Sequence, residues 1–288
     1  MDPAFIVTTI LHGLTVAMVL MLVAGGLTII FGMMDVLNFA HGSLYMLGAY
    51  MGYTIAVATG SFTLALLLAP LVVGLIGFCI EYFSLRPLYG RPPLHHLLLT
   101  FGISLITQNA IKFIWGNDIY SVEPPEFLSG AVTFFDIYYP KYRFFVLIFS
   151  SVLALAIWYL ISRTRYGVVI RAGTEDTETL EAHGIDTRKV FTAVFVVCSA
   201  LAAVGGVAVA PMRTVYPQMG LDIIIDAFIV VIVGGLGSIR GAVIGALIIG
   251  QAIQLGAVFL TGFGDVAIYI VMAAVLLLRP QGLAPETT

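Results

Sequence analysis

The sequence predicts an all-α fold, a polytopic transmembrane helical bundle of about eight spans (eight or nine) with a short cytosolic helix between two of them. Hydrophobic residues make up 60% of the 288 residues and charged residues only 10%, with a mean hydropathy of +1.05. A soluble domain carries about 25% charged residues. Apolar runs long enough to cross a bilayer recur along the chain. We therefore interpret residues 1–288 as a single membrane domain.

Nine apolar segments are candidates for the membrane spans. They are residues 6–31, 42–58, 62–85, 97–115, 143–161, 190–211, 223–236, 242–261 and 265–279. Residues 32–41 separate the first two with Gly, Asp, Asn and His, 223–236 is short and leads into a Gly-rich turn, and 265–279 is also short. Non-helical backbone at membrane depth survives only where it is buried in protein or lines a wet cavity. The first two interruptions therefore indicate a pathway near them.

The distribution of lysine and arginine predicts the orientation, because cytosolic segments carry an excess of both. An N-terminus outside the cell and a C-terminus in the cytosol give nine cytosolic residues against four outer ones. The cytosolic set is Arg86, Arg91, Arg163, Arg165, Arg171, Arg188, Lys189, Arg240 and Arg279, and the outer set is Lys112, Lys141, Arg143 and Arg213.

Polar residues at the start of the second span are the first candidates for a translocation path. Asn38 precedes His41 and Tyr45, which share one helix face with Gly48 and Gly52. The polar side chains either line the path or cap a helix and bond neighbouring backbone, and the sequence leaves both readings open. The two glycines are spaced to let another helix approach closely.

A polar stripe on the fourth span is the second candidate for the path. It consists of Thr100, Ser104, Thr107 and Gln108 on one broad face. Such side chains either join helices through hydrogen bonds, which is the commoner case, or face a pore.

The Gly-rich segment 234–241 is predicted to form a tight cytosolic turn. Gly235 and Gly237 allow the turn, and Gly241 and Gly245 form another pair of small residues for close helix packing. The segment is not a nucleotide-binding loop, because a Walker A loop needs a lysine after its last glycine. None of the three lysines follows a glycine, so we expect no bound nucleotide or other cofactor.

A charged stretch, residues 162–190, is the most distinctive polar part of the chain. It holds ten of the 29 charged residues. Thr174 is a plausible helix N-cap, acids follow it in the first turns, and Gly184 is a plausible C-terminal stop. The stretch is therefore predicted to contain a helix at 174–184 that docks a partner protein, although a solvated loop helix without a partner is the alternative. The candidate docking residues are Arg171, Thr174, Glu175, Asp176, Glu178, Glu181 and Gly184.

Other classes of function find little support. The net charge of −3 and the lack of a basic cluster argue against a nucleic-acid partner. His41 has no second ligand at helical spacing, so we expect no metal site. Cys79 and Cys198 lie inside apolar segments and are interpreted as small hydrophobes.

Several segments resemble the permease subunits of ABC importers for branched-chain amino acids and related solutes. They are residues 32–41 with the ending Asn-Phe-Ala-His-Gly, Tyr166-Gly167 with Arg171-Ala172, and the segments 181–185, 234–241 and 279–283. The resemblance covers nearly the whole chain and is strongest to the LivH type. It implies an all-helical fold with about eight spans, in the inner membrane of a bacterium.

The resemblance also implies partners and a mechanism. A second homologous permease completes the path, two cytosolic ABC ATPase subunits bind the coupling helices, and a periplasmic solute-binding protein delivers the solute. ATP is hydrolysed by the partners, so this subunit is not an enzyme. The alternatives are an ion-coupled secondary transporter, for which Asp35, Glu81 and Asp226 are the candidate acids, and a channel.

Overall fold

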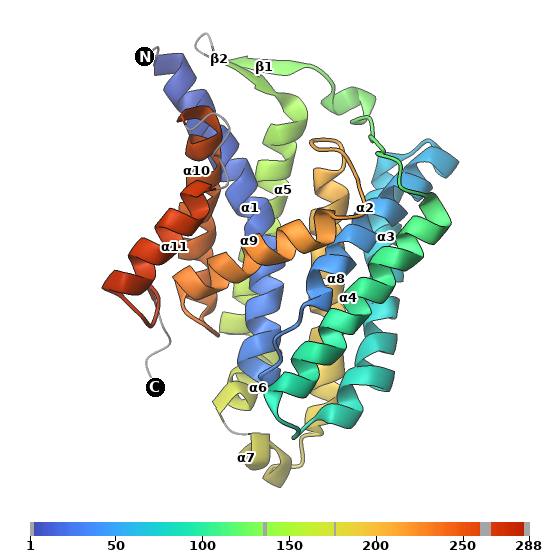
Figure 1. Ribbon diagram of the computed structural model, residues 1–288, viewed down its shortest axis with the longest axis vertical. Coiled ribbons are helices and arrows are strands. Elements are labelled where there is room, and N and C mark those ends of the chain that lie inside the picture. Colours follow the sequence, from blue (N-terminus) through green and yellow to red (C-terminus); the bar gives the residue numbers. More distant parts are fainter. Residues whose placement is uncertain (1–2, 135–136, 176, 260–265, 285–288) are drawn as a thin grey trace.

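The computed structural model describes residues 3–134, 137–175, 177–259 and 266–284. It is a bundle of helices with one small antiparallel β-hairpin (Figure 1). The elements are α1 (Pro3–Met34), α2 (Ala40–Thr59), α3 (Phe62–Ile80), a π-helical turn η1 (Glu81–Leu85), the 3-10 turns η2 (Arg86–Leu88) and η3 (Glu126–Leu128), α4 (Pro93–Trp115), β1 (Ala131–Phe134), β2 (Ile137–Pro140), α5 (Lys141–Arg163), α6 (Arg165–Glu175), α7 (Thr177–Ala182), α8 (Thr187–Val209), α9 (Met219–Gly234), α10 (Ile239–Phe259) and α11 (Val266–Leu278). The all-helical prediction is confirmed, and each of the nine apolar segments contains one of these helices within the described residues.

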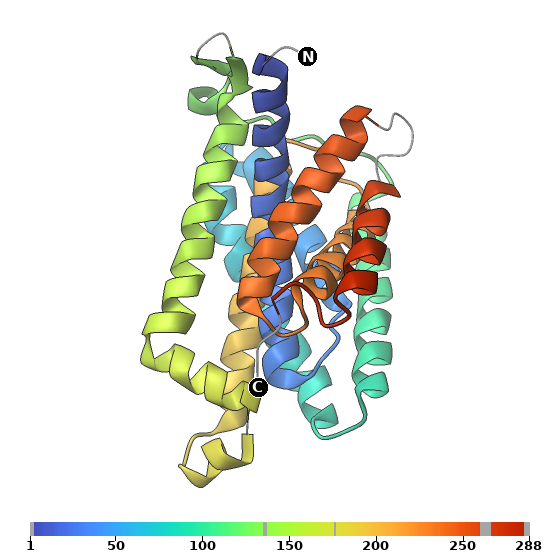
Figure 2. The same cartoon turned by 90° about the vertical axis from the view of Figure 1, so that its left-hand side faces the viewer.

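Helix α1 lies at the centre of the bundle. It packs against α10, α8, α5 and α9, and Figure 2 shows it between α5 and α10. In the most apolar 18-residue stretch of α1, 78% of the residues are buried, whereas in the corresponding stretch of α5 only 17% are buried. A helix that is hydrophobic all round belongs in an interior, so the first apolar segment forms the core rather than a peripheral span.

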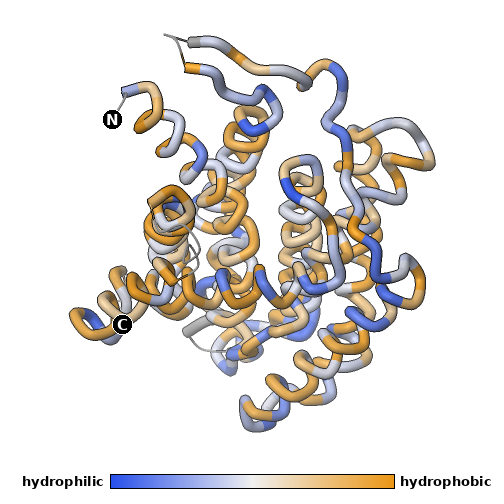
Figure 3. Tube along the Cα trace, turned by 45° about the horizontal axis from the view of Figure 1, so that its top comes forward, coloured by the Kyte–Doolittle hydropathy of each residue, from blue (hydrophilic) through white to orange (hydrophobic). Residues whose placement is uncertain are grey.

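The outer helices present apolar side chains to their surroundings. Leu71 on α3, Phe113 on α4 and Leu155 on α5 are 69%, 91% and 63% exposed. Figure 3 shows hydrophobic colour along most of the helical trace. Six helical segments are long and apolar enough to cross a membrane: α1, α3 with its continuation to Leu88, α4, α5, α8 and α10. The surface is therefore suited to lipid rather than to water.

Helices α2 and α9 both begin inside the bundle rather than at its ends. His41 in the first turn of α2 has Nε2 3.1 Å from the Val23 carbonyl oxygen. Val23 lies eleven residues before Met34, the end of α1, which corresponds to roughly 16 Å along a helix. At the same depth α9 begins, because Gly220 near its start lies directly against Gly42 of α2. Figure 1 shows α9 running across the bundle.

The two ends of the described chain lie at opposite ends of the bundle. Near the start of α1, the Thr15 hydroxyl is 2.7 Å from that of Tyr139 in the hairpin. The C-terminal segment instead pairs with the turn at 234–241, where Gly237 lies against Gly32 at the far end of α1. Ends on opposite sides require an odd number of passes, which is compatible with the expected eight or nine spans if all nine apolar segments cross; six of the described helices are long and apolar enough to do so by themselves.

Candidate functional site

The break between α1 and α2, residues 35–39, is a non-helical segment that begins at the exposed Asp35 and runs into the interior at Asn38. Asp35 has a φ of 51°, the left-handed conformation that ends a helix, and its N–H donates to the Phe31 carbonyl at 2.9 Å. The following backbone groups are satisfied by α4. The Thr100 hydroxyl donates to the Leu37 carbonyl at 3.0 Å, and it accepts from the Phe39 N–H at 3.2 Å. Protein thus covers this non-helical backbone, as membrane depth requires.

Asn38 and His41 are both fully buried at this break. One nitrogen of His41 contacts the Val23 carbonyl, while its Nδ1 and both polar atoms of the Asn38 side chain have no hydrogen-bond partner within the described chain. Buried polar groups are nearly always paired. Two unsatisfied side chains beside an interrupted helix therefore mark a polar region in the interior.

Tyr45 and the glycines of α2 form the contact with α8. The Tyr45 ring lies against Gly205, and a Cβ on Gly206 would overlap the Tyr45 carbonyl. Gly48 lies against the Ala203 backbone and Gly52 against Val207. The spacing of small residues therefore corresponds to close packing of α2 on α8.

The polar stripe of α4 faces its neighbours in the bundle. Ser43 donates to Ser104 at 2.9 Å, and the Gln108 amide donates to the Pro217 carbonyl at 3.0 Å. The Thr100 hydroxyl forms the hydrogen bonds to the backbone of Leu37 and Phe39 described above. Thr107 makes no side-chain hydrogen bond within the described residues. Three of the four stripe residues thus join α4 to other parts of the chain.

The Gly-rich turn connects α9 to α10 as expected from its composition. Gly235 and Gly237 have φ values of 113° and 80°, which L-residues rarely adopt. Gly241 and Gly245 bring the start of α10 against the end of α9, where added Cβ atoms would overlap the carbonyls of Gly234 and Val230.

The charged stretch contains two short helices, so the prediction of one helix at 174–184 is wrong. Thr174 lies in the last turn of α6 rather than at an N-cap, because α6 already begins at Arg165, and Glu175 ends it. Asp176 lies outside the described residues. Glu178 lies in the first turn of α7, and Gly184, with a φ of 80°, follows this helix.

Contacts with the bundle hold these two helices at one end of the molecule (Figures 1 and 2). Gly173 lies against Met33 of α1 and Leu180 of α7. Arg171 donates to the Ile161 carbonyl. Glu181 accepts a hydrogen bond from the Thr187 hydroxyl at the start of α8. A displacement of α7 would therefore act directly on α8.

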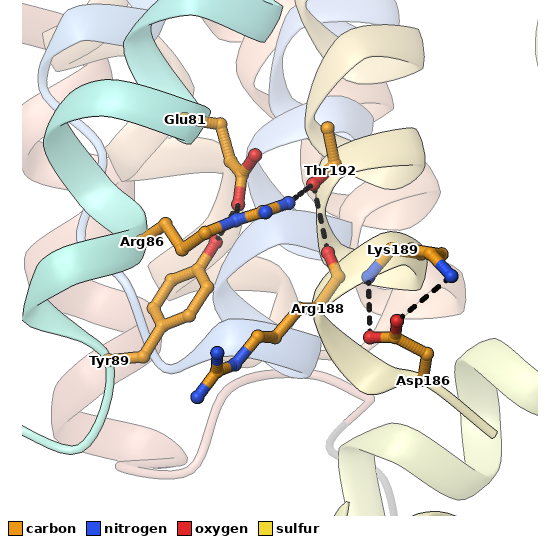
Figure 4. A network of polar contacts seen from close by, with 7 residues as sticks. All are labelled: Glu81, Arg86, Tyr89, Asp186, Arg188, Lys189 and Thr192. Carbon is orange, nitrogen blue, oxygen red and sulfur yellow. Dashed lines mark hydrogen bonds and ion pairs between the residues drawn. The ribbon is translucent and has the colours of Figure 1, made fainter. Parts of the chain in front are cut away.

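A buried ionic cluster at the same end is not anticipated from the sequence. Glu81, fully buried in the π-helical turn, accepts from the Tyr89 hydroxyl at 2.7 Å and pairs with Arg86 at 3.5 Å. Arg86 also donates to Thr192 of α8 at 2.5 Å (Figure 4). Burial raises the pKa of Tyr89, and its bond to Glu81 raises that pKa further, so the phenol remains a donor. In the sequence, this cluster is indicated by an acid and an arginine five residues apart at the end of a predicted span.

Arg86→Ala is expected to destabilise the protein by about 3–5 kcal/mol, because it leaves the Glu81 carboxylate buried without its cation. Thermal unfolding of the purified protein in detergent measures this loss.

Lys189→Ala is the matched control for Arg86→Ala. Lys189 forms an ion pair with Asp186, but the two side chains are 83% and 49% exposed, and exposed pairs contribute little. Equal losses for both variants would contradict the structural role of the buried cluster.

The described residues contain no group of three or more His, Cys, Asp or Glu side chains that could hold a metal ion. Glu81 has Arg86 as its ionic partner, which leaves it poorly suited to ion coupling.

A multi-pass bundle with interrupted helices at mid-depth and a charged helical pair at one end defines a membrane transport permease. The chain belongs to the family of permease components of branched-chain amino acid transport systems, whose family model matches residues 9–278. As a member, it is a membrane-spanning component of an ABC transport system and is not the catalytic subunit.

Curated relatives match the chain over nearly its full length. The high-affinity branched-chain amino acid transport system permease protein BraD of Pseudomonas aeruginosa is 32% identical over 95% of this chain and 94% of its own. LivH of Escherichia coli K12 is 32% identical over 94% of this chain and 93% of its own. A probable LivH permease of Methanocaldococcus jannaschii is 33% identical over 92% of this chain and 88% of its own length.

Proposed function

We propose that the chain forms, together with a second homologous permease, the path by which branched-chain amino acids or related small solutes enter the cell. The family and the full-length relatives, all named for branched-chain amino acids, carry this proposal. The polar residues Asn38, toward the end of the break, and His41 and Tyr45, in α2, form the part of the path within this chain. An ion-coupled transporter finds no comparable support.

The proposed orientation has the N-terminus outside and the end with α6 and α7 in the cytosol of a bacterial cell. The nine lysine and arginine residues expected in the cytosol belong to connections and helix ends near α6 and α7, and positive charge favours the cytosolic side. Two ATPase subunits bind at α6 and α7, one for each permease. A periplasmic solute-binding protein docks at the end that carries the β-hairpin.

The proposed import is tested by reconstitution of the complete complex in liposomes. ATP inside the liposomes and L-leucine with the binding protein outside are expected to give uptake that requires ATP. Uptake that persists without ATP but responds to a proton or sodium gradient would contradict the proposal.

Tyr45→Ala is expected to reduce uptake several-fold while the ATPase subunits still co-purify with the permease, because Tyr45 lies by the interrupted segment and far from α7. Uptake by reconstituted complex and ATPase co-purification measure the two effects.

Tyr50→Ala is the control for Tyr45→Ala. Tyr50 is a fully buried core residue of the same helix, and removal of either aromatic ring costs stability by about 3–5 kcal/mol. Equal loss of uptake per folded molecule in both variants would show that Tyr45 acts only as a core residue.

A further inference from the structure

A cavity of about 560 Å³ opens beside α6 and α7. Its wall is formed by the end of α1, the connection before α4, the helix α7 and the start of α8. Cavities that bind small ligands have volumes of about 300–1,000 Å³. The cavity is thus large enough for a small molecule at the end of the bundle that we assign to the cytosol.

The cavity wall carries two cations and two anions. Arg91 and Arg188 line it together with Asp35 and Glu181. Neither guanidinium has a hydrogen-bond or ion-pair partner within the described residues, and Figure 4 shows the Arg188 side chain without a contact to the cluster around Glu81. An arginine fork matches a carboxylate in geometry and charge.

His96 provides an independent indication of a ligand. It lines the cavity and is only 4% exposed, and the Leu88 backbone is the one hydrogen-bond partner indicated for its ring within the described residues, which leaves at least one ring nitrogen without a partner. A buried ring nitrogen without a partner is costly. A polar ligand in the cavity would supply the missing hydrogen bond.

Asp35 contributes a carboxylate to the cavity wall at the C-terminal end of α1. Asp35 has a φ of 51°, where glycine is the residue without a steric penalty. A non-glycine residue in a sparsely populated conformation is often found at a functional site. Asp35 thus combines a backbone conformation that is uncommon outside glycine with a negative charge in the cavity wall.

From these observations we infer that the cavity binds a free α-amino acid as a zwitterion, and that a bound amino acid slows further import. The carboxylate would pair with Arg91 or Arg188 and the ammonium group with Asp35. A simple anion would meet two carboxylates and a simple cation two guanidinium groups, so only a ligand with both charges is matched. The inference rests on the proposed import function and orientation.

The test uses the complete complex in liposomes, with ATP inside and labelled L-leucine and the binding protein outside. Unlabelled L-leucine loaded inside is expected to lower the initial uptake rate several-fold. L-leucinol, which lacks the carboxylate, and 4-methylpentanoate, which lacks the ammonium group, are expected to leave the rate unchanged at the same concentration. Equal inhibition by either analogue would overturn the assignment of a zwitterion site.

Variants locate the effect in the cavity. Asp35→Asn and Arg91→Gln are expected to remove the inhibition by internal L-leucine and to retain uptake into leucine-free liposomes. Asp35→Gly accepts the same backbone conformation and serves as a second charge-removing variant. Arg279→Gln, an exposed arginine outside the cavity lining, is the matched control and should remain inhibited.

Direct binding separates this inference from the proposed function. Labelled L-leucine is expected to bind the complex in nanodiscs without the binding protein, and the Asp35→Asn variant is expected to lose this binding. No uptake by the wild type in leucine-free liposomes would contradict the proposed function. Normal uptake without inhibition by internal L-leucine and without L-leucine binding would overturn the inference but leave the proposed function intact. An ATPase segment that fills the cavity would give this result.

Discussion

Gly48→Leu is expected to prevent assembly of the native bundle. A Cβ on Gly48 would already overlap the backbone of Ala203 on α8, and backbone atoms cannot move aside as a flexible side chain can. Overpacking of a core costs about 1–3 kcal/mol when side chains yield, so the cost here is larger and approaches the total stability of a typical domain, about 5–15 kcal/mol. Size-exclusion chromatography in mild detergent should show loss of the monodisperse peak.

Gly102→Leu is the control for this effect. Gly102 lies on α4, also within a membrane-spanning helix, but a Cβ there meets nothing within 4 Å. The same substitution should therefore leave the chromatographic profile and the thermal stability unchanged. Equal behaviour of the two variants, whether both fold or both fail, would show that the contact between α2 and α8 is less tight than the structure indicates.

Glu178→Arg is expected to lower ATP-driven uptake at least about tenfold, which corresponds to ~1.4 kcal/mol of lost interaction. Glu178 is exposed in the first turn of α7, on the surface where we propose that the ATPase binds. Reversal of a charge in an interface places like charges together and costs several kcal/mol in unfavourable cases. Co-purification of the ATPase subunits should fall in parallel, while the permease remains folded.

Glu123→Arg is the corresponding control at the opposite end of the molecule. Glu123 is also exposed, but it lies in the connection between α4 and the β-hairpin. Reversal of its charge should leave ATPase association unchanged. Normal association and normal uptake in the Glu178→Arg variant would contradict the assignment of α7 as the docking surface.

The helices could be predicted from the sequence because length and hydropathy alone determine which segments suit a bilayer. The place of each helix could not be predicted in this way. The segments 6–31 and 143–161 are both strongly apolar, yet α1 is central and α5 is peripheral. That difference depends on which neighbours pack against each helix, and a window of hydropathy contains no information about neighbours.

The candidate site was predictable only in part. Polar residues at 38–45 stood out because a membrane span rarely contains them, and the structure brings them together with the polar stripe of α4. The boundary between α6 and α7 was not predictable, since Thr174 is a good N-cap in isolation and the contact of Gly173 with Met33 of α1 is not visible in the local sequence. The pairing of Arg86 with Thr192 joins residues 106 positions apart, which local patterns cannot reveal.

The non-helical segment between α1 and α2 has a consequence for biosynthesis. Its Leu37 carbonyl and Phe39 N–H find their partner in Thr100, which the ribosome adds more than 60 residues later. Until α4 has entered the bilayer, those peptide groups require water or another temporary partner. The order of synthesis therefore delays the completion of α2 until two further helices have been made.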